Sequence, residues 1–254
     1  MHKTTRFLEY VIAADGIDAC VETIAESIGE TSEPRWFACL NPHSYVIAGD
    51  DPAFRQALSE ADWLVPDGVG VVLASRFLGR PVRERITGSD IFHGLHDHLN
   101  SHGGGSIFFL GSTEGVLADI RRRMSEDYPN LQVVGTYSPP YKPEFSQAEL
   151  DEMIAAVNAA KPDVLWVGMT APKQEKWIHR NRHRLRVKFI GAIGAVFDFY
   201  TDRVKRSPPL FQSMGLEWLP RLIQEPRRLW RRNFISSPKF VMRVIAHRMK
   251  NGNR

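Results

Sequence analysis

The sequence predicts an α/β fold, in which helices cover both faces of a mainly parallel sheet, followed by a basic helical appendage at the C-terminus. As far as about residue 205, short apolar runs alternate with amphipathic segments. Strands that alternate with helices usually form a parallel sheet covered on both faces. After Pro208 the pattern changes to helices alone, dense in Trp and Arg. We therefore expect a body over residues 1–207 and an appendage over residues 208–254.

The expected strands are short apolar runs, and most of them end in a turn of glycine, proline or polar residues. Runs this short suit strands buried on both faces better than they suit helices. In chain order, the expected strands cover residues 36–40, 63–65, 107–110, 132–135, 164–167 and 187–190.

The expected helices lie between these strands. Asp51 suits the N-cap of the first one, over residues 51–60, because Pro52 follows it at the first helical position. A helix over residues 147–160 ends before Pro162, since proline disfavours the helical conformation of the residue that precedes it. The remaining helices are expected over residues 69–78, 89–99 and about 115–127, and after residue 172.

Ligands of such folds bind beyond the carboxyl ends of the strands, and several polar loops follow the expected strands. These loops cover residues 41–44, 67–70, 111–115, 168–175 and 191–198. We expect them to converge on one rim of the sheet.

Two of these loops, residues 111–115 and 168–172, pass from a strand into a helix. The free N–H groups and positive dipole end of a helix N-terminus attract phosphate. Neither loop has the Walker spacing or a clean dinucleotide fingerprint. For either loop alone, the alternative is that its glycines only permit a tight turn. Together the two loops favour a nucleotide ligand.

Three polar residues near this rim are candidates for chemistry. Asp67 follows Pro66 and precedes Gly68 in a common turn sequence, but a carboxylate at the rim of a cleft could also serve as a general base. Arg85 could hold a phosphate in a bidentate contact, or it could belong to a solvated loop. His43 is more typical of a structural histidine than of a base.

The cysteine and acid patterns exclude several classes of site. Cys20 and Cys39 make no disulfide framework, which favours a reducing compartment, and both suit buried apolar positions. The sequence contains no metal-ligand cluster and no two aspartates two residues apart, so we expect no metal and no cofactor. The chain has no apolar stretch of spanning length and no signal-peptide core. Any membrane contact is therefore expected to be peripheral.

Charge is distributed unevenly along the chain. Residues 221–254 hold ten Lys or Arg and one acid, a net charge of +9, whereas the remaining 23 bases and 28 acids leave residues 1–220 at −5. Such a split suggests a large anionic partner, which could be a membrane surface, a phosphorylated lipid or a nucleic acid.

Several segments, in their order along the chain, resemble the WecG/TagA/CpsF glycosyltransferases, which form glycosyltransferase family 26. Each segment is a weak signal alone, whereas the ordered set, from about residue 36 to 232, is specific. The matching segments are residues 40–42, 62–70 with Pro-Asp-Gly-Val-Gly, 85–90, 109–111, 168–177 with Ala-Pro-Lys-Gln-Glu, 191–199 and 215–232.

The resemblance implies an inverting, metal-independent enzyme that moves a sugar from a UDP donor to a polyprenyl-diphosphate-linked sugar. Family members act peripherally on the cytoplasmic face of the membrane, in the synthesis of bacterial surface polysaccharides and exopolysaccharides. Residues 1–207 would be the catalytic domain, with Asp67 as the base, and residues 208–254 would dock on the membrane and complete the site. Around the substrates the resemblance places Cys39, Asn41, Arg85, Gly111, Lys173, Gln174 and Glu175.

The resemblance also places Arg221, Arg228 and Arg231 at the acceptor diphosphate. Their spacings of seven and three put them on one face of a helix, and guanidinium groups suit such a ligand. Apolar side chains among the bases predict a segment that lies in the interface of an anionic membrane. They are Leu229, Trp230, Phe234, Ile235, Phe240, Val241, Val244 and Ile245. The alternative is a solvated basic helix packed on the body.

Three departures from the family pattern could change which sugar is accepted. Cys39 stands where family members can carry a Thr, Thr201-Asp202-Arg203 replaces an expected Ala-Gly, and residues 137–141 replace a commoner Gly-Tyr-Phe loop. The donor sugar stays open among glucose, N-acetylmannosamine and its uronic acid. The oligomeric state stays open too, with a homo-oligomer among the alternatives.

Two other functions fit parts of the sequence. A nucleic-acid-binding protein could use the same basic tail, but no recognisable nucleic-acid motif is present, so we expect no nucleic-acid partner. A nucleotide-dependent oxidoreductase would need Gly-x-Gly-x-x-Gly after a strand, which the sequence lacks.

Overall fold

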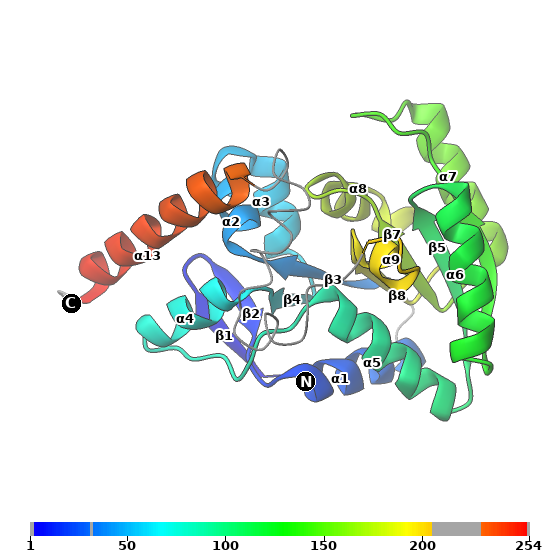
Figure 1. Ribbon diagram of the computed structural model, residues 1–254, viewed down its shortest axis with the longest axis horizontal. Coiled ribbons are helices and arrows are strands. Elements are labelled where there is room, and N and C mark those ends of the chain that lie inside the picture. The colour runs from blue at the N-terminus through cyan, green and yellow to red at the C-terminus, as the bar shows by residue number, and fades with distance from the viewer. Residues whose placement is uncertain (1–2, 31–32, 205–229, 253–254) are drawn as a thin grey trace.

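The central sheet has six parallel strands in the order β4-β3-β8-β7-β5-β6, and β1 and β2 form a separate antiparallel hairpin (Figure 1). The computed structural model describes residues 3–30, 33–204 and 230–252. Its strands are β1 Thr4–Phe7, β2 Tyr10–Ala13, β3 Arg35–Leu40, β4 Trp63–Pro66, β5 Gly105–Gly111, β6 Leu131–Tyr137, β7 Val164–Gly168 and β8 Phe189–Ala192.

Helices surround this sheet, so the predicted α/β, Rossmann-like fold is confirmed (Figure 1). A 3-10 turn, Arg182–Arg184, follows α8, and a π turn, Arg232–Ser236, precedes α13. The helices are α1 Ile17–Glu30, α2 Pro42–Asp50, α3 Pro52–Ser59, α4 Val69–Phe77, α5 Gly88–Ser101, α6 Glu114–Asp127, α7 Gln147–Ala160, α8 Lys173–Asn181, α9 Val196–Tyr200 and α13 Ser237–Gly252.

Two hydrophobic clusters, one on each face of the sheet, hold the layers together. One joins the sheet to α2, α3, α4, α7 and α8, and the other joins it to α1, α5, α6 and α9. Strand β3 serves both clusters, since Trp36, Ala38 and Leu40 enter the first and Phe37 the second. Successive side chains of a strand point to opposite faces, so a short, wholly apolar strand fits between two layers of helices.

Four elements were not expected from the sequence: the β1–β2 hairpin, α1, α2 and the short helix α9, whose first residues had been assigned to a polar loop. Helix α2 replaces the polar loop expected at residues 41–44, because the Asn41 side chain caps it and Pro42 occupies its first position. The last strand begins two residues later than expected, which leaves Val187 buried just before β8. The N-cap role expected for Asp51 is confirmed, since its Oδ1 accepts a hydrogen bond from the Phe54 N–H at 3.0 Å.

The described part of the appendage is helical, as expected, and α13 packs against α2 and α4. The Phe240 ring stacks on Phe7 with 6.3 Å between ring centroids and meets Tyr45 edge-on at 5.4 Å. The prediction that Phe240 and Val244 lie in a lipid interface is wrong, because they are only 2% and 4% exposed. Their spacing of four residues turns both toward the body.

The domain boundary expected at residues 207/208 lies outside the described residues, as do Leu229, Arg221 and Arg228. None of the helices in the described ranges is long and apolar enough to cross a membrane.

Candidate active site

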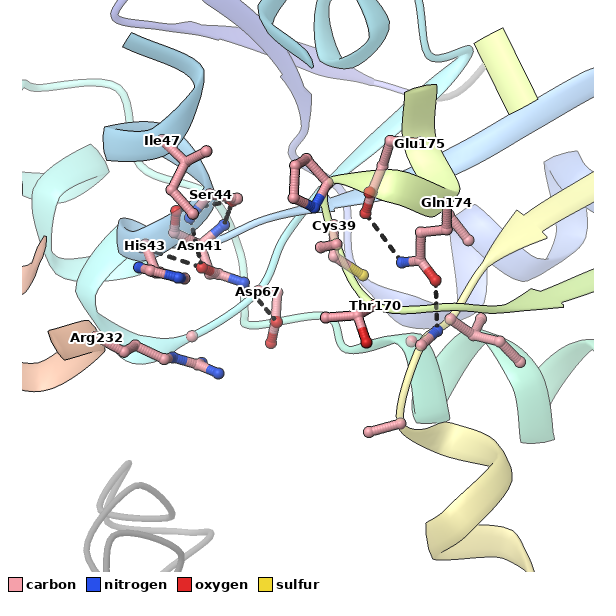
Figure 2. A pocket seen from close by; sticks show the side chains of 18 of the residues that line it. Cys39, Asn41, His43, Ser44, Ile47, Asp67, Thr170, Gln174, Glu175 and Arg232 are labelled. Carbon is pink, nitrogen blue, oxygen red and sulfur yellow. Dashed lines mark hydrogen bonds between the residues drawn. The ribbon is translucent and has the colours of Figure 1, made fainter. Parts of the chain in front are cut away.

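A large open cavity of about 1840 Å³ lies at the carboxyl ends of the parallel strands. Loops that follow β3, β4, β7 and β8 line it, together with the segment 138–145 after β6 and parts of α4 and α13. The expectation that polar loops converge on one rim is therefore confirmed. Side chains from these loops surround an open space in Figure 2.

Asn41 and Asp67 meet inside this cavity. The Asn41 Oδ1 accepts hydrogen bonds from the His43 and Ser44 N–H groups at 3.1 and 3.0 Å, which fixes the side chain as the N-cap of α2. Its Nδ2 is thereby aimed at Asp67 and donates to Oδ2 across 3.5 Å (Figure 2). One amide thus starts a helix with its oxygen and orients a carboxylate with its nitrogen.

Backbone geometry fixes the place of Asp67. Its N–H donates to the Leu40 carbonyl at 2.9 Å, which extends the pairing of β3 with β4 by one residue. Gly68 then takes a φ of +96° and turns the chain into α4, a conformation that side-chain-bearing residues rarely adopt. The Pro-Asp-Gly turn and the cleft-rim carboxylate, which were alternatives in the sequence, are therefore both present.

Cys39 lies at the end of β3 between two carboxylates, Asp67 and Glu175 (Figure 2). Burial raises the pKa of its thiol well above the ordinary value, and the negative charges of Asp67, Glu175 and Asp90 raise that pKa further. The thiol therefore stays protonated, which suits a neutral part of the cavity wall and not a nucleophile.

Gln174 and Glu175 form a connected pair in the first turn of α8. The Gln174 Oε1 accepts the Gly194 N–H at 3.0 Å, and its Nε2 donates to Glu175 Oε1 at 2.9 Å (Figure 2). Both side chains line the cavity although they are only 5% and 3% exposed. The pair ties the loop after β8 to the start of α8.

Burial raises the pKa of Glu175 to about 7. Within the described part of the chain, its Oε2 is buried without a hydrogen-bond partner. A carboxyl in such surroundings binds its proton more tightly than in water, because the charged form loses solvation. Glu175 can therefore be neutral near pH 7.

Lys173 and Arg85 both line the cavity. The Lys173 Nζ lies 3.6 Å from the centroid of the Phe145 ring and donates to the Lys142 carbonyl at 2.5 Å, so this lysine holds the loop after β6. Arg85 is half-buried and lines the cavity just before Thr87, the N-cap of α5.

Gly111 is not among the described residues that line the cavity, although the family resemblance implies a place for it at the substrates. It ends β5 with a φ of +124°, and a Cβ on it would lie 2.4 Å from the Gly168 carbonyl oxygen. Only glycine fits this close approach of two strand ends. The neighbouring Ser112 and Thr113 do line the cavity.

The C-terminal segment contributes an arginine to the cavity that the sequence did not single out. Arg232 lines the cavity and reaches toward the space beside Asp67, whereas Arg231 is exposed and is not among the described lining residues (Figure 2). His43 Nδ1 and Ser236 Oγ lie 2.8 Å apart, which links this segment to α2. Burial, and then Arg232, lower the pKa of His43. The Arg231-Arg232 doublet is visible in the sequence, but the family resemblance pointed to Arg231.

Two of the segments that depart from the family pattern differ in their relation to the cavity. Asp202 pairs with Arg123 and is not among the described lining residues. Residues 138–141 do line the cavity, so this loop can touch a ligand. In the described ranges, no group of three or more His, Cys, Asp or Glu could hold a metal ion.

Comparison with known proteins adds to this geometry. A family model described as "Glycosyl transferase WecG/TagA/CpsF family" matches residues 5–254. An N-acetylglucosaminyldiphosphoundecaprenol N-acetyl-beta-D-mannosaminyltransferase of Bacillus spizizenii is 36% identical over 82% of this chain and 77% of its own length. Proteins of the same name from Bacillus subtilis and Staphylococcus aureus are 33% and 26% identical, over 81% and 83% of this chain and 77% and 79% of their own lengths.

Proposed function

The chain belongs to the WecG/TagA/CpsF family of glycosyltransferases, and on that premise we propose that it transfers a sugar from a UDP donor to a polyprenyl-diphosphate-linked sugar. The relatives from Bacillus and Staphylococcus are named for N-acetylmannosamine transfer to N-acetylglucosaminyl-diphosphoundecaprenol. We therefore propose UDP-N-acetylmannosamine as the donor and an N-acetylglucosamine-bearing lipid as the acceptor. Glucose and the uronic acid of N-acetylmannosamine are the alternatives to be tested beside it.

The observation that carries this proposal is the Asp67 carboxylate, held at the cavity rim by the Asn41 amide. In the proposed step, Asp67 takes the proton of the acceptor hydroxyl while that oxygen attacks the anomeric carbon. The bond from the anomeric carbon to the β-phosphate oxygen breaks, and UDP leaves with the bonding electrons. Attack from the side opposite the leaving group inverts the anomeric centre.

Negative charge grows on the UDP diphosphate during this step. We propose that Arg85 and the N–H groups at the strand-to-helix turns stabilise it, without a metal ion. Gln174 would act near the donor through the Gly194 loop that it holds. Cys39 and Glu175 would form the neutral wall behind the sugar.

The acceptor diphosphate would bind at the C-terminal segment. This placement is supported by Arg232, a cationic side chain of the described C-terminal segment that lines the cavity. Arg221, Arg228 and Arg231 remain proposed contacts. Exposed apolar side chains among the bases support peripheral docking on an anionic membrane face. Those of the C-terminal segment that are not among the described lining residues are Trp230, Ile235, Met242 and Met249.

The test of the reaction is a transfer assay with a short-chain lipid-diphosphate N-acetylglucosamine acceptor and a panel of UDP-sugars. We expect product from UDP-N-acetylmannosamine with wild-type enzyme and none with Asp67→Asn, which should still bind UDP. Near-normal turnover by Asp67→Asn would reject this residue as the base. Membrane docking is tested separately, since a chain truncated at about residue 215 should no longer sediment with anionic liposomes.

A further inference from the structure

One wall of the cavity is apolar and exposed, which is unusual for large side chains of a folded protein. On α4, Val69, Leu73 and Phe77 line the cavity with 37%, 56% and 52% of their surface exposed. Facing them on α13, Val241 and Ile245 line the same cavity with 51% and 45% exposed. Their exposure in water is unfavourable, and an apolar ligand would relieve it.

These side chains form two stripes. Each follows the four-residue spacing that places side chains on one face of a helix. The α4 stripe begins two residues after Asp67 and runs for about 12 Å along the helix axis. It therefore leads directly away from the proposed catalytic carboxylate.

Side chains of helix α13 approach α4 near both ends of this stripe. The Phe240 ring lies 4.0 Å from the position that a Cβ on Gly70 would occupy. Arg248 Nη1 lies 4.0 Å from the position that a Cβ on Gly79 would occupy. Gly70 is in the first turn of α4, and Gly79 is just beyond its end. The two stripes thus border one elongated apolar groove that opens into the catalytic cavity.

The ends of this groove differ in polarity. Asp67, Asn41 and the Arg232 guanidinium lie at the inner end, and all three line the same cavity. A ligand that fits both parts needs a sugar for the carboxylate, an anionic group for the arginine and an apolar chain for the groove. The acceptor of the proposed function has these three parts in that order.

We propose that the groove between α4 and α13 binds the first isoprene units of the acceptor lipid, so that its diphosphate lies beside Arg232 and its sugar at Asp67. The inference rests on the proposed function for the identity of the lipid. It assigns the α4 stripe to substrate binding instead of to docking on the membrane surface. Met242 and Met249 of α13 are 61% and 69% exposed but are not among the described lining residues, and they stay free to contact the bilayer.

Calorimetric binding in detergent-free buffer tests this without any turnover. The probes are farnesyl diphosphate, which has a short isoprenoid chain, and inorganic diphosphate, which has none. Wild-type enzyme should bind farnesyl diphosphate about tenfold or more tightly than diphosphate. Leu73→Ser should weaken farnesyl diphosphate binding about fivefold and leave diphosphate binding unchanged. Val241→Ser, on the opposite wall, should have the same effect.

Met249→Ser is the matched control, an exposed apolar residue of α13 outside the groove, and it should leave both affinities unchanged. Equal affinities for the two probes would overturn the inference, as would equal effects of Leu73→Ser and Met249→Ser. If Leu73→Ser loses liposome binding but not farnesyl diphosphate binding, the stripe belongs to the membrane surface instead. Tight farnesyl diphosphate binding without transfer from any UDP-sugar would reject the proposed reaction, while the groove would still be assigned to an isoprenoid chain.

Discussion

The side-chain nitrogen of Asn41 lies 3.5 Å from the Asp67 carboxylate, while the oxygen of the same amide caps helix α2. The two residues follow neighbouring parallel strands, β3 and β4, so their side chains meet at one edge of the sheet. Local helix chemistry and the orientation of the proposed base therefore depend on the same side chain.

Asn41→Ser should separate these two roles. Serine is a good N-cap, so the free energy of unfolding should change by less than about 0.5 kcal/mol. The contact with Asp67 is lost. We expect kcat to fall about five- to tenfold, which corresponds to the free-energy contribution of one hydrogen bond. Ser44→Ala should show the opposite pattern, with lower stability and nearly unchanged kcat, because it removes the other half of the capping box. Equal turnover by Asn41→Ser and wild type would show that the amide does not orient Asp67.

Glu175→Gln should change how stability depends on pH. The folded-state pKa of Glu175 is raised from 4.5 to about 7, so the folded state holds the proton more tightly than the unfolded state. Its contribution to stability is therefore fully present below about pH 4.5 and is lost as pH rises to about 7. The variant does not titrate, so its advantage over wild type should grow across this window to about 3 kcal/mol.

Urea unfolding at several pH values measures this difference. Glu149→Gln is a suitable control, because hydrogen bonds from Lys142 and Ser146 lower the pKa of Glu149 to about 2. Its pH-dependent contribution is lost as pH falls below 4.5, outside the window of Glu175. A constant difference between Glu175→Gln and wild type from pH 4.5 to 8 would show that this carboxyl is ionised in the folded protein.

Phe240→Ala should release α13 from the body. The ring packs between Phe7 and Tyr45, and removing it should destabilise the docked helix by about 3–4 kcal/mol. Amide hydrogen exchange should speed up in α13 and stay slow in the central sheet. Met242→Ala, on the exposed side of the same helix, should change stability by less than about 0.5 kcal/mol. Unchanged exchange in α13 of the Phe240 variant would show that other contacts hold the helix.

Gly111→Ala should destabilise the protein by about 3 kcal/mol, because the added Cβ would collide with the Gly168 carbonyl and the φ of +124° would be strained. Gly29→Ala is the matched control in α1, since a Cβ there meets nothing within 4 Å. That variant should gain about 0.5–1 kcal/mol from helix propensity and reduced unfolded-state freedom. Thermal unfolding of both variants measures the contrast. Similar melting temperatures would show that the β5 and β7 ends can move apart.

Local patterns predicted most of the sheet and its helices. The helix over residues 147–160 has the bounds of α7, because Ser146 caps it and Lys161-Pro162 ends it. Helix α2 was missed although Asn41 and Ser44 have the spacing of a capping box, since their polar side chains had been assigned to a ligand loop. The β1–β2 hairpin was missed because three of the four residues of β1, Thr4–Phe7, are polar, so this strand forms no apolar run.

The sequence by itself determined the fold class, the order of the rim loops and the charge of the appendage, because these follow from local periodicity, turn residues and composition. Tertiary structure alone decided which side chains share the cavity. It placed Arg232 instead of Arg231 at the cavity, turned Phe240 inward and brought the α4 stripe opposite α13. Such contacts join segments more than a hundred residues apart, and their geometry depends on how whole helices pack on the sheet.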